Sequence, residues 1–469
     1  MQNNVTCYEE AVELLYRIPR FRSDHSIEQI RQFMARMGQL DRQMKIVHIA
    51  GTNGKGSTSA YLAGLLEAGG QKVGLFTSPH LIDIRERIRI NGQLVSKELF
   101  TEAVQYVLDL LRKQSEDSEK IYEPCFFDML FFAAMYVFAK QQVDFAVLET
   151  GLGGRMDATN AVSYKEVTLI THIALDHTEY LGDTKELIAT EKSGIMMQGV
   201  PCIVGSHNEE VTHVFLQKAA ELEAPCRILG SEDYTCHRVY EKAVDFSYFS
   251  RYYGTIRIEL NTPAIYQAEN AALALAGVES LIAQGIVAKS SMYSELIQET
   301  LFKVKWEGRM EEVLDGVFLD GAHNLDGMQA FLTTVAGDDC EGNRILIFSA
   351  LADKQLQEMA DVIGKSGLFT RIIVTQLQDK RAADAAQLEA LLQSSISGNE
   401  VEQKIIRMTD NEKAVRLAFT LKQSKDYIYV AGSLYLVSRM KEILTIYSNG
   451  KEFTHDSIRR RNFKVSQKP

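Results

Sequence analysis

Short runs rich in β-branched residues alternate with longer helical stretches, and this alternation limits the possible folds more than any other feature. The runs of the first half are residues 45–50, 72–76, 144–149, 167–172 and 201–204. Those of the second half are residues 317–320, 344–349, 371–375, 404–408 and 427–433. Such alternation predicts βαβ units and mostly parallel sheets. A chain of 469 residues exceeds one ordinary hydrophobic core, so the two series predict two α/β domains.

We therefore expect an N-terminal α/β domain with a parallel sheet at residues 1–303. A C-terminal Rossmann-like α/β domain is expected at residues 304–450, followed by a basic tail at 451–469. The boundary is predicted within residues 298–309, which mix charge, glycine and the only tryptophan. Three consecutive arginines at 459–461 are interpreted as part of a solvated or frayed end.

Composition excludes several functional classes. A formal net charge of -11 argues against a nucleic-acid partner that is bound by neutralising its phosphates. The six cysteines are scattered without a CxxC pair, which indicates reduced thiols in the cytoplasm, with neither a disulfide framework nor a zinc site. The N-terminal segment has no apolar signal core. The longest apolar stretch, residues 126–139, is interrupted by Asp128 and is shorter than the roughly 20 residues of a membrane span, so a buried helix is expected there.

The strongest local motif is GTNGKGS at residues 51–57, between the run at 45–50 and a helix predicted at residues 58–69. Glycines let backbone N–H groups approach phosphates, Lys55 neutralises their charge, and the helix directs its positive end at them. Gly56 separates Lys55 from Ser57, so the common Walker A spacing is not met. The alternative is a glycine-rich turn with a solvated lysine, but the strand and helix around it favour ATP binding. The N-terminal domain is therefore predicted to be a P-loop ATPase-type domain with a parallel sheet. The predicted nucleotide-binding residues are Gly51, Thr52, Asn53, Gly54, Lys55, Gly56, Ser57 and Thr58.

A nucleotide site does not by itself name a reaction. NKxD, HRD and DFG motifs are absent, which argues against a GTPase or a protein kinase. Glu149 ends the run at 144–149, Ser78 follows the run at 72–76, and His177 follows the run at 167–172. Because parallel strands end at one edge of a sheet, these side chains are expected near the phosphate loop. A glutamate and a serine suit Mg²⁺, whereas histidine is a less usual ligand, so the chemistry alone leaves His177 open.

Several other polar residues could have a purely structural role in place of a functional one. Residues 157–160, with Asp157 first, could form only a turn and a helix cap. His48 lies inside a predicted strand and is expected to be a satisfied core histidine. Asp320 and His323 follow the first run of the second series; they form a polar turn there, or reach the ribose or phosphates of a nucleotide.

Taken in order, a set of motifs resembles the folylpolyglutamate synthase/dihydrofolate synthase family. These motifs are GTNGKGS, TSPHL (77–81), ETGLGGRMDATN (149–160), ALDHTEYLG (174–182), EKSGI (191–195), QAENAALA (267–274), EGR (307–309), LDGAHN (319–324) and SALADK (349–354). The resemblance runs from about residue 20 to beyond residue 430. The related Mur ligases share the phosphate loop and the overall plan, but lack the GLGGRxDATN and LDHTxxLG pair.

The resemblance implies ATP bound at the interface of the two domains, with Asn270, Arg309 and Asp320 as nucleotide contacts and His323 beside them. It also implies one Mg²⁺ at Ser78 and Glu149, and a second metal site at His177. Lys192 matches a family lysine that is carbamylated, which turns a cation into an anionic oxygen ligand. The catalytic residues implied are Lys55, Lys192 and His177, and the metal-site residues are Ser78, Glu149, His177 and Lys192.

The resemblance further implies a pterin pocket in the N-terminal domain. Its lining segments match Cys125, Phe126, Phe127, Asp128, Met156, Asp157 and Ala158. This chain has Asp128 where the family commonly has glutamate, and Cys125 where it often has a hydroxyl or small side chain. Thr150 replaces a usually apolar residue after Glu149.

The implied reaction is ATP-dependent amide formation between L-glutamate and the carboxylate of dihydropteroate or a folate, through an acyl phosphate. A cytoplasmic monomer with no nucleic-acid or membrane partner is expected. One alternative is a Mur-type ligase that joins an amino acid to a UDP-muramyl carboxylate. Another is a regulatory nucleotide-binding protein that has lost turnover, against which the combination of Glu149, His177 and Lys192 argues.

Overall fold

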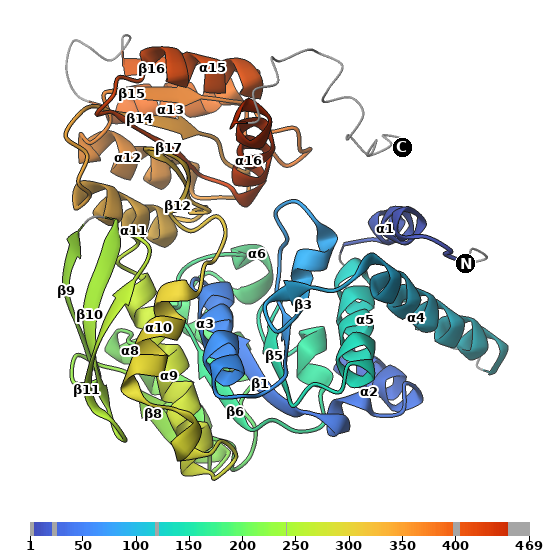
Figure 1. Cartoon of the computed structure of the whole chain (residues 1–469). Helices are drawn as coiled ribbons and strands as arrows, with labels where there is room; N and C mark the ends of the chain where they lie inside the picture. Colours follow the sequence, from blue (N-terminus) through green and yellow to red (C-terminus); the bar gives the residue numbers. More distant parts are fainter. Residues whose placement is uncertain (1–3, 21–25, 118–121, 241, 397–403, 449–469) are drawn as a thin grey trace. The chain divides into compact units, whose positions relative to one another are not determined.

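The computed structural model describes residues 4–20, 26–117, 122–240, 242–396 and 404–448, so the predicted basic tail lies outside the described residues. The chain divides into two compact units, Met1–Trp306 and Glu307–Pro469. Each unit contains its own β-sheet covered by helices (Figure 1). The predicted fold class, two α/β units with mostly parallel sheets, is confirmed.

The first unit is built on an eight-stranded sheet with the order β4-β3-β2-β5-β1-β6-β7-β8. The strands are β1 (Lys45–Ala50), β2 (Val73–Phe76), β3 (Ile88–Ile90), β4 (Gln93–Leu94), β5 (Phe145–Glu149), β6 (Val167–Ile170), β7 (Cys202–Val204) and β8 (Cys226–Ile228). In this spatial order, every neighbouring pair from β2 to β8 is parallel. At the other edge, β3 pairs antiparallel with both β2 and β4. Every strand that the sequence predicted in this half is present.

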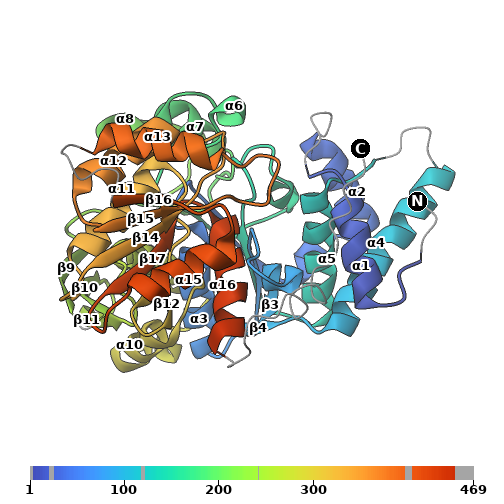
Figure 2. The same ribbon diagram turned by 90° about the horizontal axis from the view of Figure 1, so that it is seen from above.

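Helices cover both faces of this sheet because neighbouring residues of each strand point to opposite faces. Ile46 of β1 packs with the helices α1 (Tyr8–Arg17), α2 (Ile27–Arg36), α4 (Lys97–Asp117) and α5 (Phe126–Lys140). Val47 packs on the other face with α3 (Lys55–Ala68), α9 (Gln267–Ala283) and α10 (Ser294–Lys303). Figures 1 and 2 show α4 and α5 on one side of the sheet and α3 on the other. The helices α7 (Lys185–Ser193) and α8 (Glu209–Glu221) pack near β6 and β7, and short helical turns occupy Leu40–Gln43, Ile84–Arg87, Ala158–Ala161, Thr178–Leu181 (α6) and Lys289–Ser291.

Two helices test the sequence analysis directly. The predicted buried helix forms as α5, and no helix in the described parts of the chain is long and apolar enough to cross a membrane. The helix expected from residue 58 instead begins at Lys55, because Gly54 adopts the left-handed conformation with φ 91° and starts the helix there. Lys55, Gly56 and Ser57 therefore lie in its first turn, whose backbone N–H groups have no partner within the helix.

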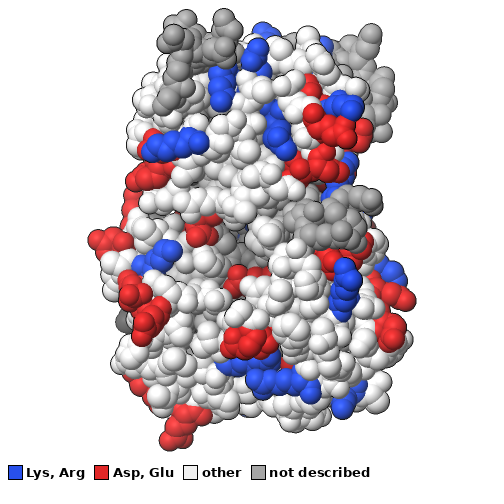
Figure 3. Space-filling view, turned by 90° about the vertical axis from the view of Figure 1, so that its left-hand side faces the viewer, with Lys and Arg blue, Asp and Glu red and all other residues white. Residues whose placement is uncertain are grey.

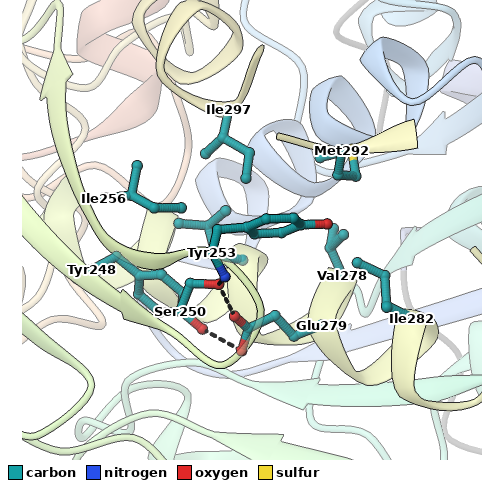
Figure 4. A pocket seen from close by; sticks show the side chains of 10 residues that line it. Tyr248, Ser250, Tyr253, Ile256, Val278, Glu279, Ile282, Met292 and Ile297 are labelled. Atoms are coloured by element: carbon teal, nitrogen blue, oxygen red, sulfur yellow. Dashed lines mark hydrogen bonds between the residues drawn. The ribbon is translucent and has the colours of Figure 1, made fainter. Parts of the chain in front are cut away.

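A second, three-stranded antiparallel sheet in the first unit was not predicted from the sequence. It consists of β9 (Tyr234–Tyr240), β10 (Ala243–Ser250) and β11 (Gly254–Leu260). A cavity of about 10 Å³ lies between β10, β11, α9 and α10 (Figure 4). That volume holds about one water molecule, which is too little for a substrate. The buried Glu279 of α9 accepts hydrogen bonds beside this cavity from Tyr248 Oη (2.9 Å) and Ser250 Oγ (2.7 Å).

The second unit has a six-stranded sheet with the order β12-β13-β17-β14-β15-β16. Its strands are β12 (Glu311–Leu314), β13 (Val317–Leu319), β14 (Arg344–Phe348), β15 (Arg371–Val374), β16 (Ile405–Arg407) and β17 (Tyr427–Ala431). The helices are α11 (Leu325–Ala336), α12 (Leu356–Ser366), α13 (Ala385–Ser395), α15 (Asn411–Leu421) and α16 (Leu434–Ser448). All predicted strands form and pair in parallel, and an antiparallel edge strand, β12, adds to them.

The face of the molecule drawn in Figure 3 carries acidic and basic side chains interspersed among uncharged ones.

Candidate functional site

The candidate site lies along the carboxyl edge of the eight-stranded sheet. The strands β2, β5, β1 and β6 are neighbours in that order, and each is followed by a predicted functional segment. Ser78 follows β2, Glu149 ends β5, the phosphate loop follows β1, and His177 follows β6. Glu149 is the register partner of Ile49, two residues before the phosphate loop. The topology therefore brings these predicted segments to one edge.

Two lysines meet at the start of the phosphate loop. Lys55 Nζ donates to the carbonyl oxygens of Gly51 (3.0 Å) and Thr52 (3.1 Å), and Lys192 Nζ donates to that of Gly51 (2.7 Å). The backbone N–H groups of Thr52 and Asn53 donate to the carbonyl of His172, at 2.8 and 3.2 Å. The loop is thus fixed from two neighbouring segments, and the Lys55 ammonium lies where an anion would be stabilised.

Lys192 occupies an unusual environment for a lysine. It lies in the last turn of α7 and is only 4% exposed. Burial, and secondly the charge of Lys55, lower its pKa to about 7. Near neutral pH, a large fraction of the molecules therefore has Lys192 as a neutral amine, which is the nucleophilic form.

Amide side chains of α9 hold the other end of the phosphate loop. A side chain at Gly54 would place Cβ 2.2 Å from Asn270 Oδ1, so only glycine fits there. Asn270 Nδ2 donates to Gln267 Oε1 (2.9 Å), and Gln267 Nε2 donates to Ser57 Oγ (3.1 Å). Sequence reasoning missed Gln267, although its spacing of three residues from Asn270 on one helix face could have indicated it.

Glu149 and Ser78 are adjacent at the ends of β5 and β2. Ser78 N–H donates to Glu149 Oε2 at 3.0 Å, and Glu149 is only 3% exposed. A carboxylate and a hydroxyl-bearing residue beside a phosphate loop fit Mg²⁺, a hard cation that prefers oxygen ligands. Within the described ranges, no group of three or more His, Cys, Asp or Glu side chains is arranged to hold a metal ion. Oxygens of phosphate and water would have to complete the coordination.

His177 lies farther along this edge, at the start of α6. Its backbone is left-handed, with φ 51°, and its side chain is 44% exposed. Asp176 Oδ1 accepts a hydrogen bond from the His177 N–H at 2.8 Å, and Asp176 is buried. The sequence analysis left Asp176 without a role, although it precedes His177 directly.

The Asp157 carboxylate organises the loop that follows Glu149. Its Oδ2 accepts from the N–H groups of Gly151 and Leu152, both at 2.8 Å. Its Oδ1 accepts from Thr159 N (3.1 Å) and Thr159 Oγ1 (2.5 Å). Asp157 is thus the buried cap of a helical turn, as the structural reading of the sequence expected. His48, fully buried, contacts Thr159 Oγ1 through Nε2 at 2.8 Å, and burial holds its pKa well below the usual range.

The segments predicted to line a pterin pocket differ in accessibility. Asp128 is buried and caps α5, since its Oδ2 accepts from Cys125 N (3.0 Å) and Tyr122 Oη (2.9 Å). Phe127 lies against the loop after Glu149, because a Cβ on Gly151 would lie 2.6 Å from its ring. Among the other residues predicted to line this pocket, Met156 is exposed, whereas Phe126 and Ala158 are buried.

The predicted nucleotide contacts of the second unit gather around Gly321, just after β13. Asp320 is buried, and its carboxylate accepts from Met310 N (2.9 Å) and Ala322 N (2.8 Å). His323 Nδ1 donates to the Gly321 carbonyl at 2.7 Å. Arg309 lies so close that a Cβ on Gly321 would be 2.1 Å from its Nη1. The structure brings these three residues together within the second unit.

Comparison with known proteins identifies the class to which this fold belongs. The Mur ligase middle domain model matches residues 128–278, and the Mur ligase glutamate ligase domain model matches residues 308–434. A curated relative, dihydrofolate synthase/folylpolyglutamate synthase of Bacillus subtilis, is 32% identical over 449 residues, covering 94% of this chain and 99% of the relative.

Solved structures agree over nearly the whole chain. Folylpolyglutamate synthase of Mycobacterium tuberculosis complexed with ADP superposes with a TM-score of 0.84 at 26% identity, covering 96% of this chain and 100% of that one. E. coli FolC in complex with DHPP and ADP superposes with a TM-score of 0.80 at 26% identity, with the same coverage. The chain belongs to the folylpolyglutamate synthase/dihydrofolate synthase family of the Mur ligase superfamily.

Proposed function

We propose that this protein joins a folate to L-glutamate by activating the folate carboxylate with ATP as an acyl phosphate. It is an ATP-dependent folate–glutamate ligase by family. The observation that carries the residue assignments is the meeting of Lys55 and Lys192 at the Gly51 carbonyl, next to the Glu149–Ser78 pair. A UDP-muramyl acceptor is less supported, because the relative that spans 94% of this chain is a folate enzyme.

In this mechanism the carboxylate attacks the γ-phosphate in line. Lys55 and the N–H groups of the first turn of α3 stabilise the charge that spreads over the transferred phosphoryl oxygens. The amine of L-glutamate then attacks the acyl carbon, and phosphate leaves. Water must be kept from the acyl phosphate, so the side chains chiefly orient the reactants and exclude solvent.

We propose Ser78 and Glu149 as the ligands of one Mg²⁺, and His177 as a ligand at a second metal site. Bound there, Mg²⁺ would neutralise charge on the phosphate oxygens. Glu149 is already oriented by the Ser78 N–H. The residues proposed to contact the nucleotide are Asn270, Arg309, Asp320 and His323. Replacing Arg309 with Ala should therefore raise the KM for ATP.

Lys192 is proposed to be carbamylated. Its amine would attack CO₂, losing one proton and forming an N-carboxylate. The side chain lies in the last turn of α7 and reaches the phosphate loop, as a metal-binding or phosphate-orienting group would require. Lys192→Ala should lose activity, and added short carboxylic acids should restore part of it; failure of every acid to rescue a folded variant would contradict the carbamate.

The substrates proposed are ATP, L-glutamate, and dihydropteroate or a reduced folate. The proposed pterin side of the site includes Cys125, Phe127, Met156 and Asp157. The residues proposed to support it are Phe126, Asp128 and Ala158. We further propose a monomer that acts in the cytoplasm, in folate biosynthesis and one-carbon metabolism. Size-exclusion chromatography with light scattering would check the monomer.

The decisive experiment offers the purified protein ATP, glutamate and one acceptor at a time: dihydropteroate, tetrahydrofolate or a UDP-muramyl substrate. Glutamate-dependent ADP release is expected with a folate acceptor and not with the UDP-muramyl one. Lys55→Ala should abolish it, and retained activity would remove Lys55 from the mechanism. If none of the three acceptors leads to ADP release, the regulatory alternative is favoured.

A further inference from the structure

The extra glycine of the phosphate loop, Gly56, is covered by the only tryptophan of the chain. A Cβ on Gly56 would lie 2.9 Å from both Cζ2 and Nε1 of Trp306 and 3.0 Å from its Cε2. Three ring atoms at that distance leave no space for any side chain. The indole therefore fills the place that a side chain at position 56 would take, which gives the departure from Walker A spacing a physical reason.

Gly56 lies in the part of α3 that is free to bind an anion. It is the second residue of the helix, between Lys55 and Ser57. Backbone N–H groups in a first turn have no partner within the helix and point toward a bound phosphate. A ring packed against this turn limits how far its N–H groups can shift. Trp306 is itself half-buried and packs against the core between the sheet and α3.

The contact belongs to a segment that lies along α3. Two turns beyond Gly56, a Cβ on Gly64 would lie 2.8 Å from Val304 Cγ2. The segment from the end of α10 through Val304 to Trp306 thus follows one face of α3 on small residues, with Ala60 between the two glycines. The Arg89 guanidinium of β3 lies 5.9 Å from the centroid of the indole. A cation over the ring adds a second restraint on its position.

We propose that Trp306 is a positioning residue for ATP: its indole, packed on Gly56, fixes the first turn of α3 in the orientation that binds the phosphates. Trp306 is the last residue of the first unit and is 250 residues away from the loop that it supports. The proposal rests on the phosphate loop being the ATP site. Loss of all activity in Lys55→Ala tests that assumption separately from the role of Trp306.

The structure offers a matched control, because Val304 packs on the same helix face away from the phosphates. In assays of glutamate-dependent ADP release, Trp306→Ala should raise the KM for ATP about tenfold. The fall in kcat should be smaller, since the first turn of α3 shifts but Lys55 still stabilises the transferred phosphoryl group. The KM for glutamate should not change. Val304→Ala should lower the unfolding midpoint but keep the wild-type KM for ATP.

Two outcomes would overturn the proposal. One is a wild-type KM for ATP in folded Trp306→Ala. The other is an equal rise in Val304→Ala, which would reduce the contact to general packing of α3. If Trp306→Ala does not fold, Trp306→Phe decides by the same comparison: a smaller ring should raise the KM for ATP about threefold, and an unchanged value contradicts the proposal.

Discussion

Lys165, like Lys192, is a buried lysine with a lowered pKa. Lys165 is 1% exposed, and its Nζ donates to Asn160 Oδ1 and the Ile195 carbonyl, both at 2.6 Å. Both partners are neutral, so the ammonium is hydrogen-bonded but its charge is not balanced by them. Burial lowers the pKa of Lys165 to about 7. Its hydrogen bonds connect the segment after the 151–160 loop to the end of α7, which carries Lys192.

This shift predicts a pH dependence of stability. Between pH 7 and about 10.5, Lys165 is protonated in the unfolded chain but largely neutral in the folded protein, so unfolding takes up a proton. The free energy of unfolding relative to Lys165→Met should therefore rise with pH, by at most about 1.4 kcal/mol per pH unit. Urea unfolding of both proteins at pH 7, 8 and 9 measures the difference. A difference that stays constant with pH would contradict the shifted pKa.

The sequence could predict the residues whose partners are close in the chain or share a sheet edge. The phosphate loop is one continuous motif, and Ser78 and Glu149 end parallel strands. Gln267 and Trp306 were missed because their contacts with Ser57 and Gly56 cross more than 200 residues. The role of Asp157 also stayed open, because a residue that caps a helical turn and a residue that binds substrate can occur in the same local sequence.

At the level of secondary structure, helix–strand alternation predicted the parallel strands, but the antiparallel sheet was missed. In β11 the buried residues alternate with exposed ones, as in any half-buried strand. That period-two pattern, in Ile256, Ile258 and Leu260, was the available signal. The strands have no intervening helices, so they do not fit the βαβ pattern that identified the rest.

Glu279 should determine how firmly this antiparallel sheet is attached to α9. The buried carboxylate accepts from Arg227, Tyr248, Ser250 and the Arg251 N–H, which joins the sheet and β8 to one helix. Glu279→Ala removes the acceptor of all four hydrogen bonds, although Arg227 keeps Asp233 as a charge partner, and should cost about 3–5 kcal/mol. Chemical denaturation measures this loss, and hydrogen exchange should show β10 and β11 losing protection first.

A carboxylate on a neighbouring helix provides the control for that experiment. Glu299 of α10 pairs with Lys303 at 3.3 Å, and its side chain is 67% exposed. Because exposed ion pairs contribute little, Glu299→Ala should have a much smaller effect than Glu279→Ala. Similar losses in the two variants would mean that the buried network does not hold the sheet.

For the whole molecule, the division into two compact units predicts unfolding in more than one step. Each unit has its own sheet and its own buried core. The only tryptophan, Trp306, belongs to the first unit, so its fluorescence reports that unit, whereas far-UV circular dichroism reports both. The two signals should give different denaturation midpoints. Coincident curves would show that the units unfold as one.

Nucleotide should shift the transition of the first unit, because that unit contains the phosphate loop. A ligand that binds only the folded state stabilises it by about 2.7 kcal/mol when its free concentration is 100 times Kd. Mg²⁺ and ADP should therefore move the fluorescence-detected midpoint to higher denaturant, by an amount that grows with ADP concentration. In Lys55→Ala the midpoint should stay nearly constant, since the loop has lost the cation that neutralises the phosphates. A wild-type midpoint that does not respond to ADP would place the nucleotide elsewhere.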